Sequence, residues 1–129
     1  MAPTVSYWDC GEFIAVSHTL GVPHPPGSPF FLLLGRIFSM LPFNEDIAFR
    51  VNIISPLVSA LAVMLLYLSI VKVVTHWRGK VNSLSDCLIV FGGGAAGALA
   101  FAFTDSHWFN AVEAEVYAFS TFFTAIVVW

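Results

Sequence analysis

Charged residues are scarce in this chain of 129 residues: Asp, Glu, Lys and Arg make up 10% of it, whereas hydrophobic residues make up 58%. A soluble domain of this length needs more charge than this to cover its surface. The chain also lacks a basic stripe with interleaved aromatic residues, which argues against nucleic acid as a partner. We therefore predict an all-α integral membrane protein whose first partner is the lipid bilayer.

Cysteine is also rare, with Cys10 and Cys87 as the two examples. Neither belongs to a CxxC motif or to a Cys/His zinc pattern. The N-terminus lacks a basic segment followed by an apolar run, so no signal peptide is predicted. The topology argued below places the two thiols on opposite sides of the membrane, and no disulfide between them is expected.

Two long uncharged runs organise the chain. We predict transmembrane helices at residues 47–71 and 87–104, because each contains an apolar run of spanning length. A third run, residues 116–129, begins a span and is too short to complete it. In the second span, Gly93 and Gly97 form a small-xxx-small pattern, and we expect that face to pack closely against another helix.

A shorter apolar segment precedes the first span. Residues 30–46 follow Pro29 and are interrupted by Arg36. Their length is typical of an interfacial or re-entrant helix and turn. A cation there is costly unless it is paired or snorkels to the headgroups. Arg36 is therefore a candidate for binding a lipid phosphate, with snorkelling as the alternative.

The basic residues predict the orientation of the spans. Lys72, Arg78 and Lys80 cluster in the loop at residues 72–86, which the positive-inside rule places in the cytoplasm. The acidic loops at residues 1–29 and 105–115 then face the other, extracytoplasmic side. Residues from distant parts of the sequence are thereby expected on one membrane face: Asp9, Glu12, His24, Asp105, Glu113 and Glu115.

Asp9 and Glu12 form the first candidate catalytic pair. If residues 8–17 are helical, their i, i+3 spacing puts both carboxylates on one face. Such close like charges are expected to raise one pKa, and the pair can share a proton or a cation. The alternative is a pair of solvated charges that favour a helix N-terminus.

The sequence HPPGSP at residues 24–29 predicts a stiff turn, because proline fixes φ and restricts the residue before it. Such a turn can hold His24 near the carboxylates at the membrane surface. Equally, it can simply lead the chain into the next apolar segment.

Three polar side chains lie at the mouth of the third apolar run. In a continuous helix Glu113 and Tyr117 share a face, whereas Glu115 points elsewhere. The two glutamates are therefore not expected to act as one carboxylate pair. A functional role and simple loop charge are both open for them.

Four motifs give the chain a family resemblance. The sequence PTVSYWDCGEFIA is followed by HPPGSPFFLLLGRIFS, RVNIISPLVSAL and WFNAVEAEVYAFSTFF. Together they resemble the bacterial branch of a membrane family, once known as a domain of unknown function, whose animal relative is an endoplasmic-reticulum protein O-mannosyltransferase of plexin-type receptors. More loosely, the acid pair, the HPP sequence, a short helix and an arginine-led span resemble the GT-C glycosyltransferases.

The resemblance implies a GT-C-like multi-span helical bundle of which this chain is the N-terminal portion. It also implies transfer of a sugar, at family level mannose, from a polyprenyl-phosphate donor to Ser or Thr hydroxyls of an exported protein, with inversion. The resemblance identifies no certain cofactor, and a divalent metal is the candidate that it leaves open.

The same resemblance implies roles for individual residues. Asp9 matches the position of the general base, and Glu12 would assist or orient it. His24 and Arg36 are candidates for binding the donor phosphate. The acceptor site or second acidic motif of the family falls at Glu113, Glu115 and Tyr117.

The family pattern includes a span before the Asp-x-Gly-Glu loop and several spans after residue 129. We therefore expect a fragment that is inactive alone, from a bacterial inner-membrane protein. Two other functions are open. One is a proton- or ion-coupled transporter, since acids at membrane edges and broken helices also mark transport pathways. The other is a non-catalytic scaffold subunit that binds helices through its glycine face.

Overall fold

The structure is a computed structural model that describes residues 9–25 and 27–129. Within this part of the chain every regular element is a helix, which confirms the prediction of an all-α membrane fragment. Trp8 and Pro26, which belong to the predicted first helix and to the HPPGSP turn, lie outside the described residues, as do residues 1–7 of the predicted acidic loop. The elements are α1 (Cys10–Thr19), α2 (Pro29–Met40), α3 (Ile47–Asn52), α4 (Ile54–Arg78), α5 (Leu84–Cys87), the π-helical turn η1 (Leu88–Gly92), α6 (Gly93–Ala102), α7 (Asp105–Val112) and α8 (Tyr117–Val128).

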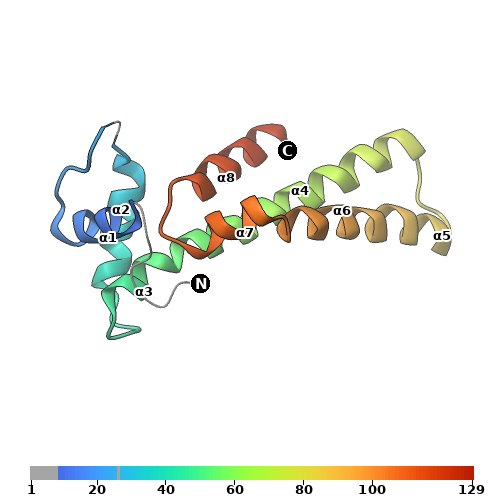
Figure 1. Ribbon diagram of the computed structural model, residues 1–129. Coiled ribbons are helices and arrows are strands. Elements are labelled where there is room, and N and C mark those ends of the chain that lie inside the picture. Colours follow the sequence, from blue (N-terminus) through green and yellow to red (C-terminus); the bar gives the residue numbers. More distant parts are fainter. Residues whose placement is uncertain (1–8, 26) are drawn as a thin grey trace.

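Among the described residues, two helical stretches are long and apolar enough to cross a membrane, judged by length and composition. The first is Ile47–Arg78, which joins α3 and α4, and the second is Leu84–Ala102, which joins α5, η1 and α6. Helices α7 and α8 add a third if the pair, bent by 116°, is one broken span. Helices α6 and α8 both pack against α4 (Figure 1).

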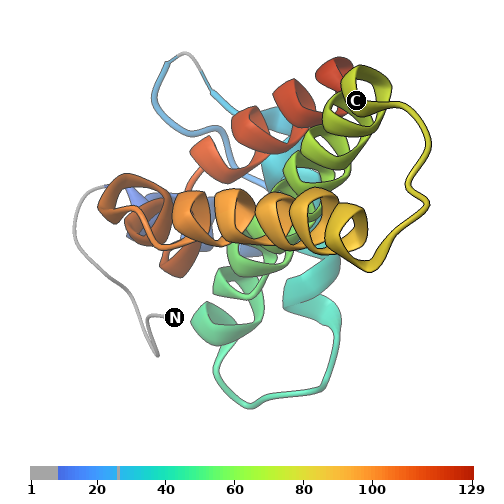
Figure 2. The same ribbon diagram turned by 90° about the vertical axis from the view of Figure 1, so that its right-hand side faces the viewer.

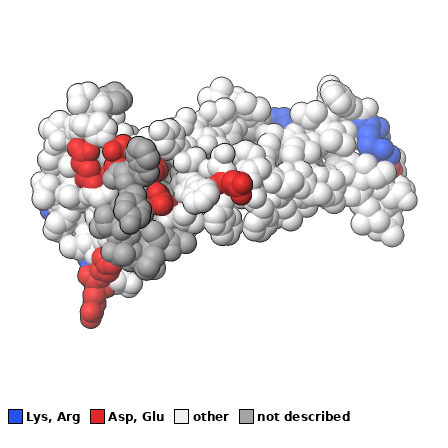
Figure 3. Space-filling view, in the orientation of Figure 1, with Lys and Arg blue, Asp and Glu red and all other residues white. Residues whose placement is uncertain are grey.

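Helix α4 continues beyond the end predicted for the first span. Lys72 and Arg78 were expected in a loop, but both are helical, and the chain turns at Gly79, which has φ +82°. A helix can continue past the apolar region here because the long stems of Lys and Arg cover apolar surface while their charges reach water. Figure 3 shows blue side chains gathered at this far end of α4 and most red ones over the end that carries α1.

The glycines of α6 pack differently from the expected pattern. A Cβ on Gly94 would lie 3.0 Å from Val71 Cγ2, and one on Gly97 would lie 3.3 Å from Ile70 Cδ1. A Cβ on Gly93 would have no neighbour within 4 Å. The contact face therefore uses Gly94 and Gly97, which lie three residues apart on one side of the helix, and the prediction for Gly93 is wrong within this structure.

The buried core lies at one end of α4, where α1, α2, α3 and the segment between α7 and α8 meet. Along the rest of α4 and α6, large apolar side chains such as Leu61 and Leu99 are exposed, as expected for a surface that faces lipid. The core is formed by Cys10, Phe13, Ile14, Phe31, Leu32, Ala48, Val51, Ile54, Val58, Ala114, Ala118 and Phe119.

A close approach fixes α1 on α2. A Cβ added to Gly35 of α2 would lie 2.8 Å from Cβ of Ser17 on α1, closer than side-chain carbons normally come. Both residues are buried. Because α1 carries the first acidic residues, this contact also fixes where those residues lie.

Candidate functional site

The N-terminus of α1 presents two carboxylates. Asp9 is the N-cap of this helix, and its carbonyl oxygen accepts a hydrogen bond from Phe13 N–H at 2.9 Å. Its side chain makes no capping hydrogen bond and is 52% exposed. Glu12 follows in the first turn. The Asp9 carboxylate is therefore positioned by the helix backbone yet free to meet a ligand.

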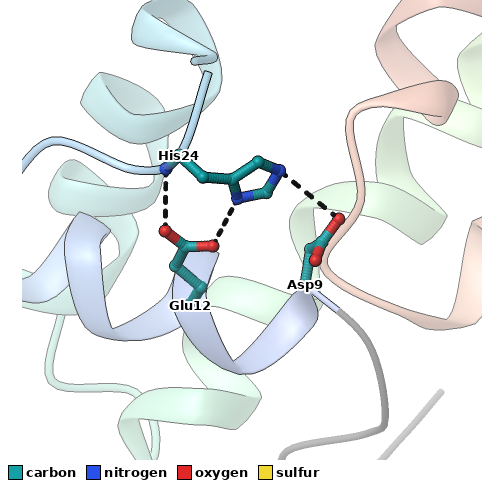
Figure 4. Close-up of side chains that lie close together, drawn as sticks. All are labelled: Asp9, Glu12 and His24. Atoms are coloured by element: carbon teal, nitrogen blue, oxygen red, sulfur yellow. Dashed lines mark hydrogen bonds and ion pairs between the residues drawn. The ribbon is translucent and has the colours of Figure 1, made fainter. Parts of the chain in front are cut away.

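Glu12 contacts both the backbone and the ring of His24 (Figure 4). One carboxylate oxygen accepts the backbone N–H of His24 at 2.8 Å, and the other lies 2.6 Å from Nδ1 of its ring. On the other side of the ring, Nε2 lies 3.8 Å from a carboxylate oxygen of Asp9. The HPPGSP turn thus brings His24 between the two carboxylates.

The electrostatics of the pair differ from the sequence-based expectation. The hydrogen bond to the His24 ring lowers the pKa of Glu12, and the bond from the His24 backbone lowers it further. The same ring contact raises the pKa of His24, with smaller help from the charges of Glu12 and Asp9. The expectation that repulsion between the two carboxylates raises one pKa of the pair does not hold for Glu12, because an imidazole lies between the two side chains.

A small cavity opens beside this cluster. Its volume is about 270 Å³, and it is lined by Asp9 and His24, by Glu115 from the break between α7 and α8, and by Tyr117 at the start of α8. Burial raises the pKa of Glu115, and the nearby Asp9 charge adds to that shift. The remaining lining residues are Phe13, Gly27, Ser28 and Val116.

The position of Glu115 corrects another expectation. Residues 113–116 are not helical, because α7 ends at Val112 and α8 begins at Tyr117. The prediction that Glu113 and Tyr117 share a helical face is therefore wrong, and it is Glu115 that lines the cavity together with Tyr117. The Ser55 hydroxyl of α4 lies 3.4 Å from the backbone N and 3.5 Å from the backbone O of Glu115, which holds the break against α4.

Three predicted site residues do not line the cavity: Glu12, which contacts His24 beside it, Arg36 and Glu113. The Arg36 guanidinium donates a hydrogen bond to the carbonyl oxygen of His18, near the C-terminal end of α1. Glu113 follows α7, and its charge contributes to the raised pKa of Glu115. The structure therefore brings together Asp9, Glu12 and His24 with Glu115 and Tyr117, and it leaves Arg36 on the opposite end of α1.

Phe13 and Ser28 are cavity residues that sequence reasoning missed. Phe13 lies one helical turn after Asp9, with its ring centroid 6.4 Å from that of His24. Ser28 belongs to the HPPGSP turn already noted for its stiffness. The i, i+4 relation between Asp9 and Phe13 is the signal that could have identified the aromatic residue.

Asp9, Glu12 and His24 could also hold a divalent cation. Each offers one ligand atom, and these atoms lie within 4.8 Å of one another. Carboxylate oxygen and imidazole nitrogen are ordinary ligands of such metals. Binding through Nδ1 requires the 2.6 Å contact with Glu12 to open.

We expect the His24 ring to titrate above its ordinary pKa of 6.5, and Glu12→Gln to return that pKa toward 6.5 because the negative acceptor is lost. The contact between Glu12 and His24 contributes its full stabilisation between pH 4.5, the ordinary pKa of glutamate, and pH 6.5, the ordinary pKa of histidine. The stabilisation is lost as pH rises through the raised pKa of His24 or falls through the lowered pKa of Glu12. An NMR titration of the ring signals measures this shift.

Glu45→Gln is the control for that titration, because Glu45 is an exposed acid in the turn before α3. It should leave the His24 pKa unchanged. Equal His24 pKa values in the wild type and in Glu12→Gln would contradict the expected clamp.

The chain is similar in sequence to a known family of membrane proteins. Residues 9–129 match the family described as protein O-mannosyl-transferase TMEM260 N-terminal domain. Similar curated proteins are protein O-mannosyl-transferase tmem260 of Dictyostelium discoideum, with 32% identity over 98% of this chain and 14% of the relative, and protein O-mannosyl-transferase TMEM260 of Mus musculus, with 32% identity over 92% of this chain and 15% of the relative. The chain thus spans about one seventh of the length of these relatives. No solved structure matches it.

Proposed function

Because this chain belongs to the family of protein O-mannosyl-transferase TMEM260, we propose that it supplies the acidic face of a mannosyltransferase site. The reaction would move mannose from a polyprenyl-phosphate donor to a Ser or Thr hydroxyl of an exported protein. The observation that carries this proposal is the cavity in which the exposed Asp9 carboxylate, the His24 imidazole and the half-buried Glu115 converge.

Asp9 is the proposed general base. Its carboxylate takes the proton of the acceptor hydroxyl while the hydroxyl oxygen forms a bond to the anomeric carbon of mannose. The bond from that carbon to the donor phosphate breaks on the opposite side, and the phosphate leaves with the electron pair. This single displacement inverts the configuration of the anomeric carbon.

Glu12 is the proposed positioning residue for His24. Its two oxygens hold both the backbone and the ring of His24, so that Nε2 is directed toward Asp9. With its raised pKa, His24 carries positive charge in mildly acidic conditions and can meet the negative phosphate as it departs. This charge is the contribution of His24 to donor binding in the proposed reaction.

Glu115 and Tyr117 are proposed to bind the acceptor on the opposite wall of the cavity. A carboxyl group whose pKa is raised by burial can retain a proton and donate a hydrogen bond. The phenol of Tyr117 can donate or accept one. Glu113 would add negative charge near this wall without contacting the ligand directly.

Arg36 was expected to bind the donor phosphate, and its contacts support a different role. Its guanidinium donates to the carbonyl of His18, near the end of α1. The negative end of the α1 helix dipole stabilises a cation at this position. We propose that Arg36 holds α1 in place and that His24 is the cation beside the reacting phosphate.

The site is proposed to face the extracytoplasmic side, because the basic residues cluster at the far end of α4 (Figure 3). A polyprenyl-phosphate donor is anchored in the bilayer, so its sugar would reach the cavity at the membrane surface. Both named relatives come from eukaryotes, and the bacterial inner membrane expected from the sequence stays a prediction.

A transporter is the second candidate, and the observation that favours it is the 116° bend between α7 and α8. Broken helices near a membrane site also bind substrates and ions in transporters. Proton-coupled uptake into vesicles that depends on Glu115 would support this function.

Deletion of the gene and its reintroduction test the transferase proposal. We expect hexose on Ser and Thr of exported proteins to disappear in the deletion strain and to return with the wild-type gene, as measured by glycopeptide mass spectrometry. Washed membranes supplied with polyprenyl-phosphate mannose should restore transfer, whereas nucleotide-linked mannose without the lipid should not. Unchanged hexose after deletion would count against the proposal.

A further inference from the structure

The outward side of α2 is an apolar stripe that the described residues leave largely exposed. Phe30, Leu33, Ile37 and Met40 are each at least 50% exposed. Their spacing of three or four residues puts them on one helix face. This set is called the outer face of α2.

The opposite side of α2 is packed. Its buried residues include Phe31, Leu32 and Gly35, and it contacts α1 and α3. Arg36 is the charged residue of this helix, and its guanidinium donates to His18 on α1. The outer face is therefore apolar and uncharged, while polar contacts of α2 go to His18 on α1 and to Arg50 on α3, the helices on its packed side.

The direction of α2 suggests what covers the outer face. In both views α2 runs vertically, whereas α6 runs horizontally (Figures 1 and 2). If α6 crosses the bilayer, α2 lies close to the membrane plane at the end of the spans. Its 12 residues are also too few to cross the membrane as a helix.

The outer face continues into an apolar helix. The Phe30 ring lies 5.4 Å from the ring of Phe119 and 5.6 Å from that of Phe123, both on α8. Phe123 is 45% exposed, and α8 packs along the spanning helix α4. One continuous apolar surface thus runs from the lipid-facing side of α8 onto α2.

We propose that α2 lies in the membrane interface, with its outer face inserted into the acyl chains and α1 packed on its opposite side. The partner is the lipid bilayer itself. Because a helix with its side chains is about 10 Å wide, α1 then holds the acidic cluster about one helix diameter above the acyl chains. This placement of α2 is independent of the chemistry proposed for Asp9.

Spin labels at Leu33→Cys and Ile37→Cys test this placement in the full chain, reconstituted into vesicles of phosphatidylcholine and phosphatidylglycerol. A Cys87→Ser background leaves Cys10, which is fully buried. The same background without an added cysteine measures any labelling of Cys10. Accessibility to oxygen, which enters the acyl chains, is compared with accessibility to a water-soluble nickel chelate.

We expect both labels to favour oxygen over the nickel chelate and to lie about 5–10 Å inside the headgroup boundary. Leu61→Cys on α4 should lie deeper, and Glu45→Cys in the turn before α3 should favour the nickel chelate. Labels on α2 that behave like Glu45→Cys would place the outer face in water and overturn the proposal. Labels as deep as Leu61→Cys would make α2 re-entrant, and labels protected from both reagents would show that protein covers the face. Either result would also overturn it.

Discussion

Asp9→Asn should lower mannosyl transfer by about 10²- to 10⁴-fold, because an amide cannot accept the proton of the acceptor hydroxyl. The fold should be unaffected, since asparagine is as good an N-cap residue as aspartate. The Asp9 side chain also makes no capping hydrogen bond that the substitution could break. The measurement is hexose on exported proteins in cells whose gene carries the substitution, with protein abundance determined in parallel.

Asp105→Asn is the matched control for Asp9→Asn. Asp105 is an acid at the N-terminal end of another helix, in the first turn of α7, and it is exposed and does not line the cavity. Transfer should stay close to the wild-type level in this variant. If the two variants transfer hexose equally well at normal abundance, Asp9 is not the base.

Gly35→Leu should destabilise the fold by about 3 kcal/mol, because α1 and α2 approach each other too closely at this point for a larger side chain. Even the first carbon of a side chain would meet Ser17 Cβ at 2.8 Å. The expected result is a lower midpoint of thermal unfolding, followed by circular dichroism in detergent micelles. Because α1 carries Glu12, the raised His24 pKa should also move toward its ordinary value.

Gly93→Leu gives the comparison for this substitution. Gly93 also lies in an apolar helix, but a Cβ there has no neighbour within 4 Å. Its thermal midpoint should stay near that of the wild type or rise, since leucine favours helix more than glycine does. Equal losses in both variants would mean that the α1–α2 contact contributes nothing specific.

Much of this architecture could be predicted from the sequence, because membrane helices follow from uncharged length. The run after Arg50 has one stable solution in lipid, since its backbone polar groups must be paired within the helix. The convergence of Asp9, Glu12 and His24 could also be anticipated. The spacing of the first two and the stiffness of HPPGSP are local properties of the chain.

The role of Glu115 could not be predicted in the same way. Glutamate and alanine in the sequence VEAEV favour helix, so a continuous helix through residue 117 was the natural expectation. The break at residues 113–116 is associated with contacts that local propensity does not encode, such as the Ser55 hydroxyl beside the Glu115 backbone. Tertiary contact overrides propensity here, and it changes which glutamate faces the cavity.

Arg36 shows a similar limit. Its position in an apolar segment indicated that the cation needs a partner, which the structure bears out. The partner is the carbonyl of His18, and this contact depends on how α1 folds back onto α2. The sequence pattern predicts that the Arg36 cation has a partner, whereas the packing of α1 against α2 determines which group that partner is.

The two contacts of Glu12 with His24, one to the backbone and one to the ring, close a loop between residues 12 and 24. Closing a loop of this length and fixing a side-chain rotamer both cost conformational entropy. Here that cost is met when the protein folds, before any ligand arrives. The imidazole consequently loses little conformational entropy when a ligand binds. The site is preorganised, so its affinity for a ligand depends on how well the ligand fits rather than on ordering of the protein.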